Sequence, residues 1–305
     1  MASDPSGVLR PFVSVIIPVF NDARRLRGCL DALEQQTYPA DRYEVVVVDN
    51  GSTDRPESVV AAHAHAVCVR EPRPGSYAAR NAGLARAKGE VLAFTDADAR
   101  PEPGWLEHGV RRLGALEGDG MVGGRLECVF DRQGTPNFAE RFDAVTYLRQ
   151  QHYVERQHFA ATANMFATRA VFDRVGGFRA DLFSSGDAEW GTRVHRAGFP
   201  QAYADDAVVA HRARGSVWKI IALHRRLLGG WFALRSTPAL PHHPTSLWQL
   251  LNGFPLYPSI WFSMRQHPQV HGRGQALSYY AFSLCLRYVQ ALEWIRLSLG
   301  GRPRR

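Results

Sequence analysis

Short β-branched runs alternate with helical repeats along the first hundred residues, and this alternation limits the fold more than any other feature. The first run, VSVIIPV over 13–19, is apolar almost throughout, which is typical of a strand buried on both faces. Further strands are predicted over 43–48, 66–70 and 90–95, with intervening helices over about 22–36, 56–64 and 76–87. The order predicts βαβ units, a largely parallel central sheet flanked by helices and the α/β class.

Polar clusters stand where three of these strands end, which is where ligands bind in such sheets. The sequence is PVFN over 18–21, DNGSTD over 49–54 and TDAD over 95–98. Asp96 and Asp98 are two carboxylates at i and i+2, and Mg²⁺ or Mn²⁺ bind through one or two carboxylates together with substrate phosphates. Each cluster alone is more typical of a solvated or Asx-rich turn. Their joint order favours a divalent cation site that also receives a diphosphate.

Charge divides the chain unevenly. Residues 1–100 hold 12 basic and 13 acidic side chains, and residues 101–210 hold 12 and 15. Residues 211–305 hold 13 basic side chains against one acid, Glu293, and five of the seven Trp residues also lie there. We therefore expect a flexible N-terminus over 1–11, a main region over 12–212 and a mostly helical, basic, aromatic-rich region over 213–305.

Composition and cysteine usage exclude several classes of protein. With 305 residues, 45% of them apolar, the chain is neither wholly disordered, collagen-like nor a disulfide-stapled miniprotein. The four Cys residues are far apart and form no CxxC pair, and the N-terminus has no apolar segment behind a positive one. These features favour a reducing, cytoplasmic location.

The clustered motifs resemble the family 2 glycosyltransferases, which have the GT-A fold. The match is carried by VSVIIPVFND (13–22), VVVVDNGSTD (45–54), GSYAARNAGLARAKGEVLAFTDAD (75–98), NMFATRAVFDRVGGF (164–178) and GDAEWGTRVHRAG (186–198). The resemblance covers about 12–212, with a nucleotide-binding half over 12–100 and an acceptor half over 101–212. It implies transfer of a sugar from a nucleotide-diphosphate sugar to an acceptor hydroxyl, commonly with inversion, assisted by Mn²⁺ or Mg²⁺.

The resemblance also implies roles on the donor side. It assigns the nucleotide base, the ribose and other contacts with the donor to Pro18, Phe20, Asn21, Asp49, Arg80 and Asp96. It assigns the metal to Asp98, with Asp96 contacting the ribose or a metal-bound water, and to His211, directed at the metal or the diphosphate. The alternatives are a surface Arg80 paired with a nearby glutamate and a structural His211.

On the acceptor side, the resemblance implies that Asp187 is the general base. Its alternative interpretation is an N-cap of a helix. Here Gly186 replaces the carboxylate that commonly precedes this aspartate; loss of that like charge would leave Asp187 a somewhat weaker base. Glu189 is the next candidate for the base, although Glu189 and Trp190 are expected to line the acceptor side, as is Asn164.

The basic region contains no clear membrane-spanning segment. Residues 236–264 have no charged side chain but are interrupted by prolines, and the helical stretch 276–299 contains three charges. Aromatic residues interleaved with arginine are typical of a surface that lies in lipid headgroups, which predicts attachment to an anionic membrane at its inner face. The acceptor would then be lipid-linked or a cell-surface glycan precursor. The alternative is packing within the chain or in a homodimer.

The sequence disfavours two other functions. A basic nucleic-acid-binding protein would suit the arginine-rich end of the chain, but the sequence has no nucleic-acid fingerprint, so no nucleic-acid partner is expected. A sugar-nucleotide transferase would need a Gly-rich phosphate loop after the first strand, which FNDA over 20–23 does not supply.

Overall fold

The structure, a computed structural model, describes residues 10–130, 135–147, 149–237, 246–252, 256–267 and 269–303. The expected flexible N-terminus, 1–11, lies outside these ranges apart from its last two residues. The elements are, in order, β1 Val13–Val19, α1 Ala23–Glu34, the short 3₁₀ helix η1 Ala40–Arg42, β2 Tyr43–Asp49, α2 Pro56–Val60, β3 Ala66–Arg70, α3 Ser76–Arg86, β4 Val91–Thr95, β5 Ala99–Pro101, α4 Trp105–Gly114, β6 Met121–Val129, α5 Phe138–Thr146, α6 Gln150–Gln157, β7 Asn164–Thr168, α7 Arg169–Val175, α8 Gly186–Arg196, β8 Gln201–Arg212, α9 Val217–Leu234, α10 Leu247–Leu250, α11 Pro258–Gln266 and α12 Gly272–Ser298.

The predicted strands and helices of residues 13–95 are all present. One of them is shorter than expected: the helix predicted over 56–64 ends at Val60, because residues 61–65 form turns that lead into β3. The agreement is close here because the strands are short, mostly apolar runs rich in β-branched residues, and α1 has a clear apolar repeat.

The described strands form one eight-stranded sheet in the order β3-β2-β1-β4-β7-β6-β8-β5. The α/β class is confirmed. β1 pairs in parallel with β2 and β4, and β2 pairs in parallel with β3. The other half is mixed: β7 runs antiparallel to β4 and β6, β6 runs parallel to β8, and β8 runs antiparallel to β5. The direction changes at β7 because this strand begins beside the carboxyl end of β4, with Asn164 opposite Thr95.

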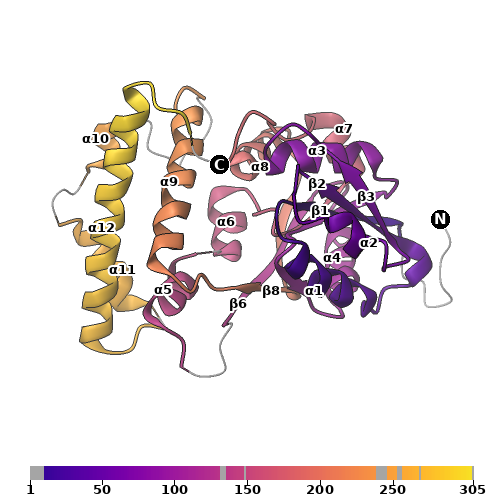
Figure 1. Ribbon diagram of the computed structural model, residues 1–305, viewed down its shortest axis with the longest axis horizontal. Coiled ribbons are helices and arrows are strands. Elements are labelled where there is room, and N and C mark those ends of the chain that lie inside the picture. Colours follow the sequence, from indigo (N-terminus) through magenta and orange to yellow (C-terminus); the bar gives the residue numbers. More distant parts are fainter. Residues whose placement is uncertain are drawn as a thin grey trace. The chain divides into compact units, whose positions relative to one another are not determined.

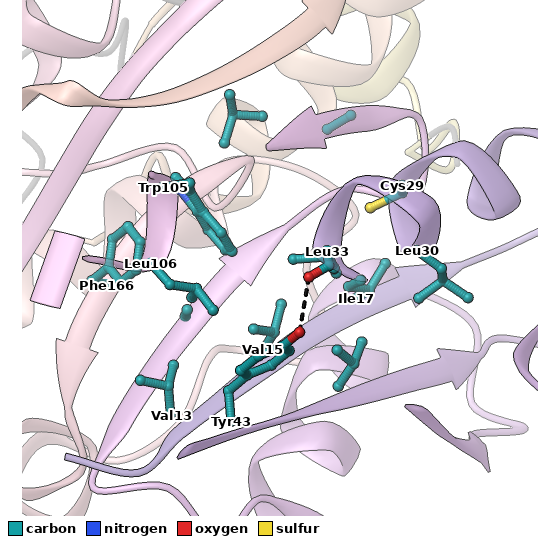
Figure 2. Close-up of a cluster of buried hydrophobic side chains, with 14 of the residues drawn as sticks. Val13, Val15, Ile17, Cys29, Leu30, Leu33, Tyr43, Trp105, Leu106 and Phe166 are labelled. Carbon is teal, nitrogen blue, oxygen red and sulfur yellow. Dashed lines mark hydrogen bonds between the residues drawn. The ribbon is translucent and has the colours of Figure 1, made fainter. Parts of the chain in front are cut away.

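Helices cover both faces of the parallel half of the sheet. Successive strand residues point to opposite faces, so each buried strand supplies two cores. On one face, Val13, Val15 and Ile17 pack with residues of α1, α2 and α4, as Figure 2 shows in part. On the other face, Val48 packs against Ala79 of α3. Figure 1 shows α1 and α3 on opposite sides of these strands.

Helix α3 lies very close to the sheet at Gly83. A Cβ atom built at this position would be 2.5 Å from Cγ2 of Ile16 and 3.2 Å from Cγ2 of Val48. Only glycine allows this approach without displacing the neighbours. The close packing fixes α3, which carries several of the side chains of the candidate site.

The chain folds as two compact units. The first contains the described residues of 10–129, 149–182 and 186–212, including the sheet. The second contains those of 130–147, 183–185 and 213–303, so two segments of the region 12–212 belong to it. Its core includes Phe142, Ile220 and Tyr279 from α5, α9 and α12, and α9 and α12 lie side by side in Figure 1. Over the described residues, no helix has both the length and the apolarity needed to cross a bilayer.

Candidate functional site

The loops after β1 and β2 are joined by hydrogen bonds at the carboxyl edge of the sheet. Asn21 adopts a left-handed conformation, with φ of 51°, and its Oδ1 accepts a hydrogen bond from the Thr53 backbone N–H at 2.8 Å. The Asn21 backbone N–H donates to Ser52 Oγ at 3.0 Å. Phe20 is 44% exposed beside it, whereas Pro18 is half-buried within β1. The structure therefore groups these three predicted donor residues at the end of one strand.

Asp49 lies at the end of β2 and is almost buried, with Oδ1 accepting from the Ser52 backbone N–H at 2.8 Å. Its neighbour Asn50, which the sequence did not single out, connects this loop to the segment before α3. The Asn50 side-chain amide donates to the carbonyl of Arg73 at 2.8 Å, and its Oδ1 accepts from the Gly75 N–H at 2.8 Å. These bonds position the start of α3 relative to β2.

Three potential metal ligands meet at the end of β4. Asp96, Asp98 and His211 each offer one ligand atom, and these atoms all lie within 4.8 Å of one another. Nε2 of His211 is 3.8 Å from Oδ1 of Asp98. The pairing of β5 with β8 places Ala99 opposite His211, which brings the imidazole beside the preceding aspartate. The structure thus brings together the three ligands that the sequence predicted.

Arginines contact both carboxylates of this cluster. Arg80 of α3 is buried, and its Nη2 donates to Oδ1 of Asp96 at 2.6 Å. The buried Nε of the same guanidinium has no hydrogen-bond acceptor among the described residues. Arg25 of α1, which the sequence analysis missed, lies 3.3 Å from Oδ2 of Asp98 and 2.8 Å from Oδ1 of Asp22. The alternative interpretation, a pairing of Arg80 with a nearby glutamate, is wrong, because Arg80 pairs with Asp96.

Asp187 is in the first turn of α8 and receives two hydrogen bonds from other residues. The hydroxyl of Tyr77 donates to Oδ1 at 3.1 Å, and the backbone N–H of Ala188 donates to the same oxygen at 2.9 Å. Tyr77 lies three residues before Arg80, so one face of α3 presents both side chains. Helix α3 therefore contacts Asp96 through Arg80 and Asp187 through Tyr77.

Burial raises the pKa of Asp187 above its ordinary value, since a charged carboxylate loses solvation in this environment. The Ala188 N–H, the positive charge of Arg80 and the Tyr77 hydroxyl act in the opposite direction and limit the rise. The absence of a neighbouring carboxylate at Gly186 does not leave Asp187 with a low pKa, because burial has the largest effect. A carboxylate with a raised pKa is suited to accept a proton.

Asn164, which was predicted to face the acceptor, makes contacts within the sheet. Asn164 is completely buried at the start of β7. Its Oδ1 accepts from Trp105 Nε1 at 2.8 Å, and its amide donates to the carbonyls of Arg125 at 2.8 Å and Ala207 at 2.9 Å. The side chain connects β6, β7, β8 and α4 and stabilises the sheet, since a buried amide must be paired.

Trp190, which was predicted to line the acceptor side, packs inside the first unit. Its ring is fully buried and stacks on Phe172, with ring centroids 4.3 Å apart, while Nε1 donates to the carbonyl of Gly176 at 2.9 Å. Glu189 is nearly buried and forms an ion pair with Arg193 at 2.9 Å. Glu189 is therefore held by a cation, whereas Asp187 is held by a phenol and an amide N–H.

Asn81 is a further residue that the sequence analysis missed. Its amide donates to the carbonyl of Phe178 at 2.7 Å, and its Oδ1 accepts from the N–H of the same residue at 2.9 Å. This pair of bonds connects α3 to the turn that follows Gly176, where φ of 79° favours glycine. The signal was the sequence YAARN over 77–81, which places three polar side chains close together on one helix.

Comparisons with known proteins agree on the class. The family described as glycosyl transferase family 2 matches residues 14–176. The Haloferax volcanii protein "Glycosyltransferase AglE" is 39% identical over 209 residues, which cover 67% of this chain and 68% of that protein. A pre-mycofactocin glycosyltransferase of Mycobacterium tuberculosis is 29% identical over 255 residues, which cover 79% of this chain but half of the relative's length.

Solved structures share the fold over nearly the whole chain. The mannosyltransferase PcManGT from Pyrobaculum calidifontis, in complex with GDP-Man and Mn²⁺, superposes with a TM-score of 0.64 at 24% identity, covering 97% of this chain and 88% of that one. Residues 1–349 of S. aureus TarS in complex with UDP-GlcNAc give a TM-score of 0.56 at 16% identity, with 96% and 93% covered.

Proposed function

Since the chain belongs to glycosyl transferase family 2, we propose that it is an inverting, metal-assisted enzyme that moves a sugar from a nucleotide-diphosphate sugar to an acceptor hydroxyl. The observation that carries the proposal is the double contact of α3, with Asp96 through Arg80 and with Asp187 through Tyr77. One rigid helix thereby connects a diphosphate-binding edge with a candidate base. Family membership favours glycosyl transfer over the nucleic-acid-binding and sugar-nucleotide transferase alternatives.

The donor binds at the ends of β1, β2 and β4. In this proposal, Phe20, Asn21 and Asp49 contact the base and ribose. The buried Nε of Arg80 has no acceptor in the described part of the chain and suits an oxygen of the diphosphate, because a buried donor without an acceptor is costly unless a ligand supplies one. The two structural relatives named above were solved with GDP-Man and UDP-GlcNAc, which supports a sugar nucleotide as the donor.

The cluster of Asp96, Asp98 and His211 fits a divalent cation. Two carboxylates and one imidazole lie within reach of one ion, and carboxylate oxygens are preferred ligands of Mn²⁺ and Mg²⁺. The bound ion would neutralise the negative charge that develops on the departing nucleoside diphosphate. The Mn²⁺ in the P. calidifontis structure supports manganese as the first ion to test.

Asp187 accepts the proton of the acceptor. The acceptor oxygen forms a bond with the anomeric carbon while the bond from that carbon to the diphosphate breaks, and the acceptor proton passes to the carboxylate. The raised pKa of Asp187 assists this transfer, and its anchoring by Tyr77 and Ala188 keeps the carboxylate in place.

Removal of the carboxylate charge tests this role. We expect Asp187→Asn to lower turnover by about 10² to 10⁴, the usual contribution of general-base catalysis, while donor binding is retained. The measurement is release of nucleoside diphosphate from GDP-mannose and UDP-N-acetylglucosamine, with calorimetry of the same donors for binding. Glu189→Gln is the control, since that carboxylate is paired with Arg193. Wild-type turnover in Asp187→Asn would contradict the assignment.

We further propose that the second unit attaches the enzyme to an anionic membrane surface. Trp218 and Trp248 are 74% and 78% exposed, and Leu292 is 67% exposed. Glu293, the one acid of residues 211–305, is buried in ion pairs with Arg225 and Arg296, so it leaves the basic surface unopposed. Exposed tryptophan beside excess arginine suits lipid headgroups. A lipid-linked acceptor would be concentrated at such a surface.

A further inference from the structure

We propose that Tyr77 is a positioning residue for Asp187: its hydroxyl holds Oδ1 and leaves Oδ2 as the oxygen that takes the acceptor proton. The inference rests on the proposed function, because it takes Asp187 as the general base. Both hydrogen bonds that other described residues make to this carboxylate end on Oδ1. A carboxylate held through one oxygen retains the lone pairs of the other for the reaction.

The phenol of Tyr77 is itself firmly held. Its ring is 5% exposed and packs against Phe178, with ring centroids 5.6 Å apart, while the Arg80 guanidinium carbon lies 5.7 Å from its centroid. Burial, reinforced by the negative charge of Asp187, raises the pKa of Tyr77 well above its usual range. The phenol therefore stays protonated and remains a hydrogen-bond donor throughout the pH range in which an enzyme of this kind works.

Gly186 provides the space for this arrangement. A Cβ atom at position 186 would lie 2.7 Å from Cε2, 2.8 Å from Cδ2 and 2.9 Å from Cζ of the Tyr77 ring. Any larger residue would displace the ring from Asp187. Glycine at position 186 thus leaves room for the Tyr77 ring, whose hydroxyl stands beside Asp187.

Two ionisable groups of α3 act on Asp187. Tyr77 donates a hydrogen bond to its carboxylate, and the positive charge of Arg80, which is also bound to Asp96, favours its charged form. Burial raises the pKa of Asp187, and the Tyr77 hydrogen bond lowers it. Loss of the hydroxyl therefore moves the titration of Asp187 to higher pH, and a larger share of the base is protonated near neutral pH.

Tyr77→Phe isolates the hydroxyl, because the ring and its packing remain. The readout is the ¹³C titration of aspartate side chains in labelled protein, with the Asp187 signal assigned by its disappearance in Asp187→Asn. We expect the Asp187 titration and the acid limb of nucleoside-diphosphate release to move to higher pH, with about tenfold slower release at neutral pH. Gly186→Ala, which crowds the ring, should shift the titration in the same direction.

Tyr43→Phe is the matched control. It also removes one buried phenol hydroxyl, which donates to the Leu33 carbonyl at 2.9 Å at the start of β2. This substitution should leave the Asp187 titration unchanged. In the Asp187→Asn background, Tyr77→Phe should cause no further loss of release. An unchanged Asp187 titration in Tyr77→Phe overturns the inference. Wild-type release in Asp187→Asn would instead overturn the proposed base, whatever the titration shows.

Discussion

At the scale of single residues, the acids of the site differ in whether they form an ion pair with an arginine. Asp96 is paired with Arg80, Asp98 with Arg25, and Glu189 with Arg193. Asp187 has no ion pair within 4 Å among the described residues and is held by a hydroxyl and an amide N–H. Burial raises the pKa of Asp187, which fits a proton acceptor.

Sequence reasoning found the candidate metal ligands but not the residues that contact them from within the protein. Asp96, Asp98 and His211 could be predicted because the ends of strands converge at one edge of a sheet and because the family motif places them there. The burial of Asn164 could not be predicted, since it depends on tertiary contacts with carbonyls far away along the chain. Tyr77 was missed for a similar reason: its partner is 110 residues away in sequence.

His224 makes the stability of the second unit depend on pH. Burial, together with the positive charges of Arg214 and Arg287, lowers its pKa to about 4. Its Nδ1 is 3.0 Å from the amide nitrogen of Gln290, which suits a neutral ring that accepts a hydrogen bond. The folded state therefore binds the proton less readily than the unfolded state, whose His pKa is about 6.5.

The free energy of unfolding should keep the full contribution of His224 above pH 6.5 and lose that contribution as the pH drops toward 4. We expect a loss on the order of 2 kcal/mol by pH 5 from this group. Tryptophan fluorescence in urea measures it, because five of the seven Trp residues follow residue 212. His224→Gln should remove this part of the pH dependence, whereas the exposed His271→Gln should keep it. Identical pH profiles for wild type and His224→Gln would refute the prediction.

At the scale of elements, α3 organises the first unit. It packs on β1 and β2 through Gly83 and contacts the loop after β2, the residues after β4, the turn near Phe178 and the start of α8. The strands of residues 13–95 were predictable from short apolar runs, and the helices between them from their apolar repeats and their alternation with the strands. The elements within 121–160 were not, because this stretch matches the family motifs poorly.

The packing of α3 can be tested at Gly83. Alanine is intrinsically better than glycine in a helix by about 1 kcal/mol, but its methyl group would meet Ile16 at 2.5 Å. Because overpacking costs about 1–3 kcal/mol, we expect Gly83→Ala to be less stable than wild type in urea unfolding and to bind donor more weakly. Gly114→Ala, where nothing lies within 4 Å of the new atom, is the control. Unchanged stability in Gly83→Ala would show that α3 tolerates displacement.

At the scale of the whole molecule, the excess of positive charge and most of the candidate site residues lie in different parts of the sequence. The near-neutral residues 1–210 contain the candidate base and the two aspartates of the candidate metal cluster, and residues 211–305 carry a formal charge of +12. The sequence predicted this division of charge directly from counting. It did not predict that residues 135–147 and 183–185 belong to the second unit, since that depends on contacts made after folding.

Sedimentation with vesicles tests the proposed membrane surface. We expect the full chain to sediment with phosphatidylglycerol vesicles at low salt, to remain in solution with phosphatidylcholine, and to lose binding when Trp218 and Trp248 are replaced by alanine. Arg273→Glu should weaken binding about tenfold, and Arg86→Glu of the first unit is the matched control. Two results would contradict membrane attachment: no sedimentation with phosphatidylglycerol vesicles, or a dimer that dissociates in the tryptophan variants. Either result would indicate that this surface is a protein interface.

The central claim is that the strand ends bind a nucleoside diphosphate together with a divalent cation, and calorimetry of GDP and UDP tests it most directly. The account predicts that at least one of them binds in the presence of Mn²⁺, that a chelator weakens this binding, and that Asp98→Asn weakens it at least tenfold. Asp206→Asn, whose carboxylate contacts Arg111, should bind as wild type. Binding that is equally strong without metal and in Asp98→Asn, or no binding of either nucleotide, would contradict the account.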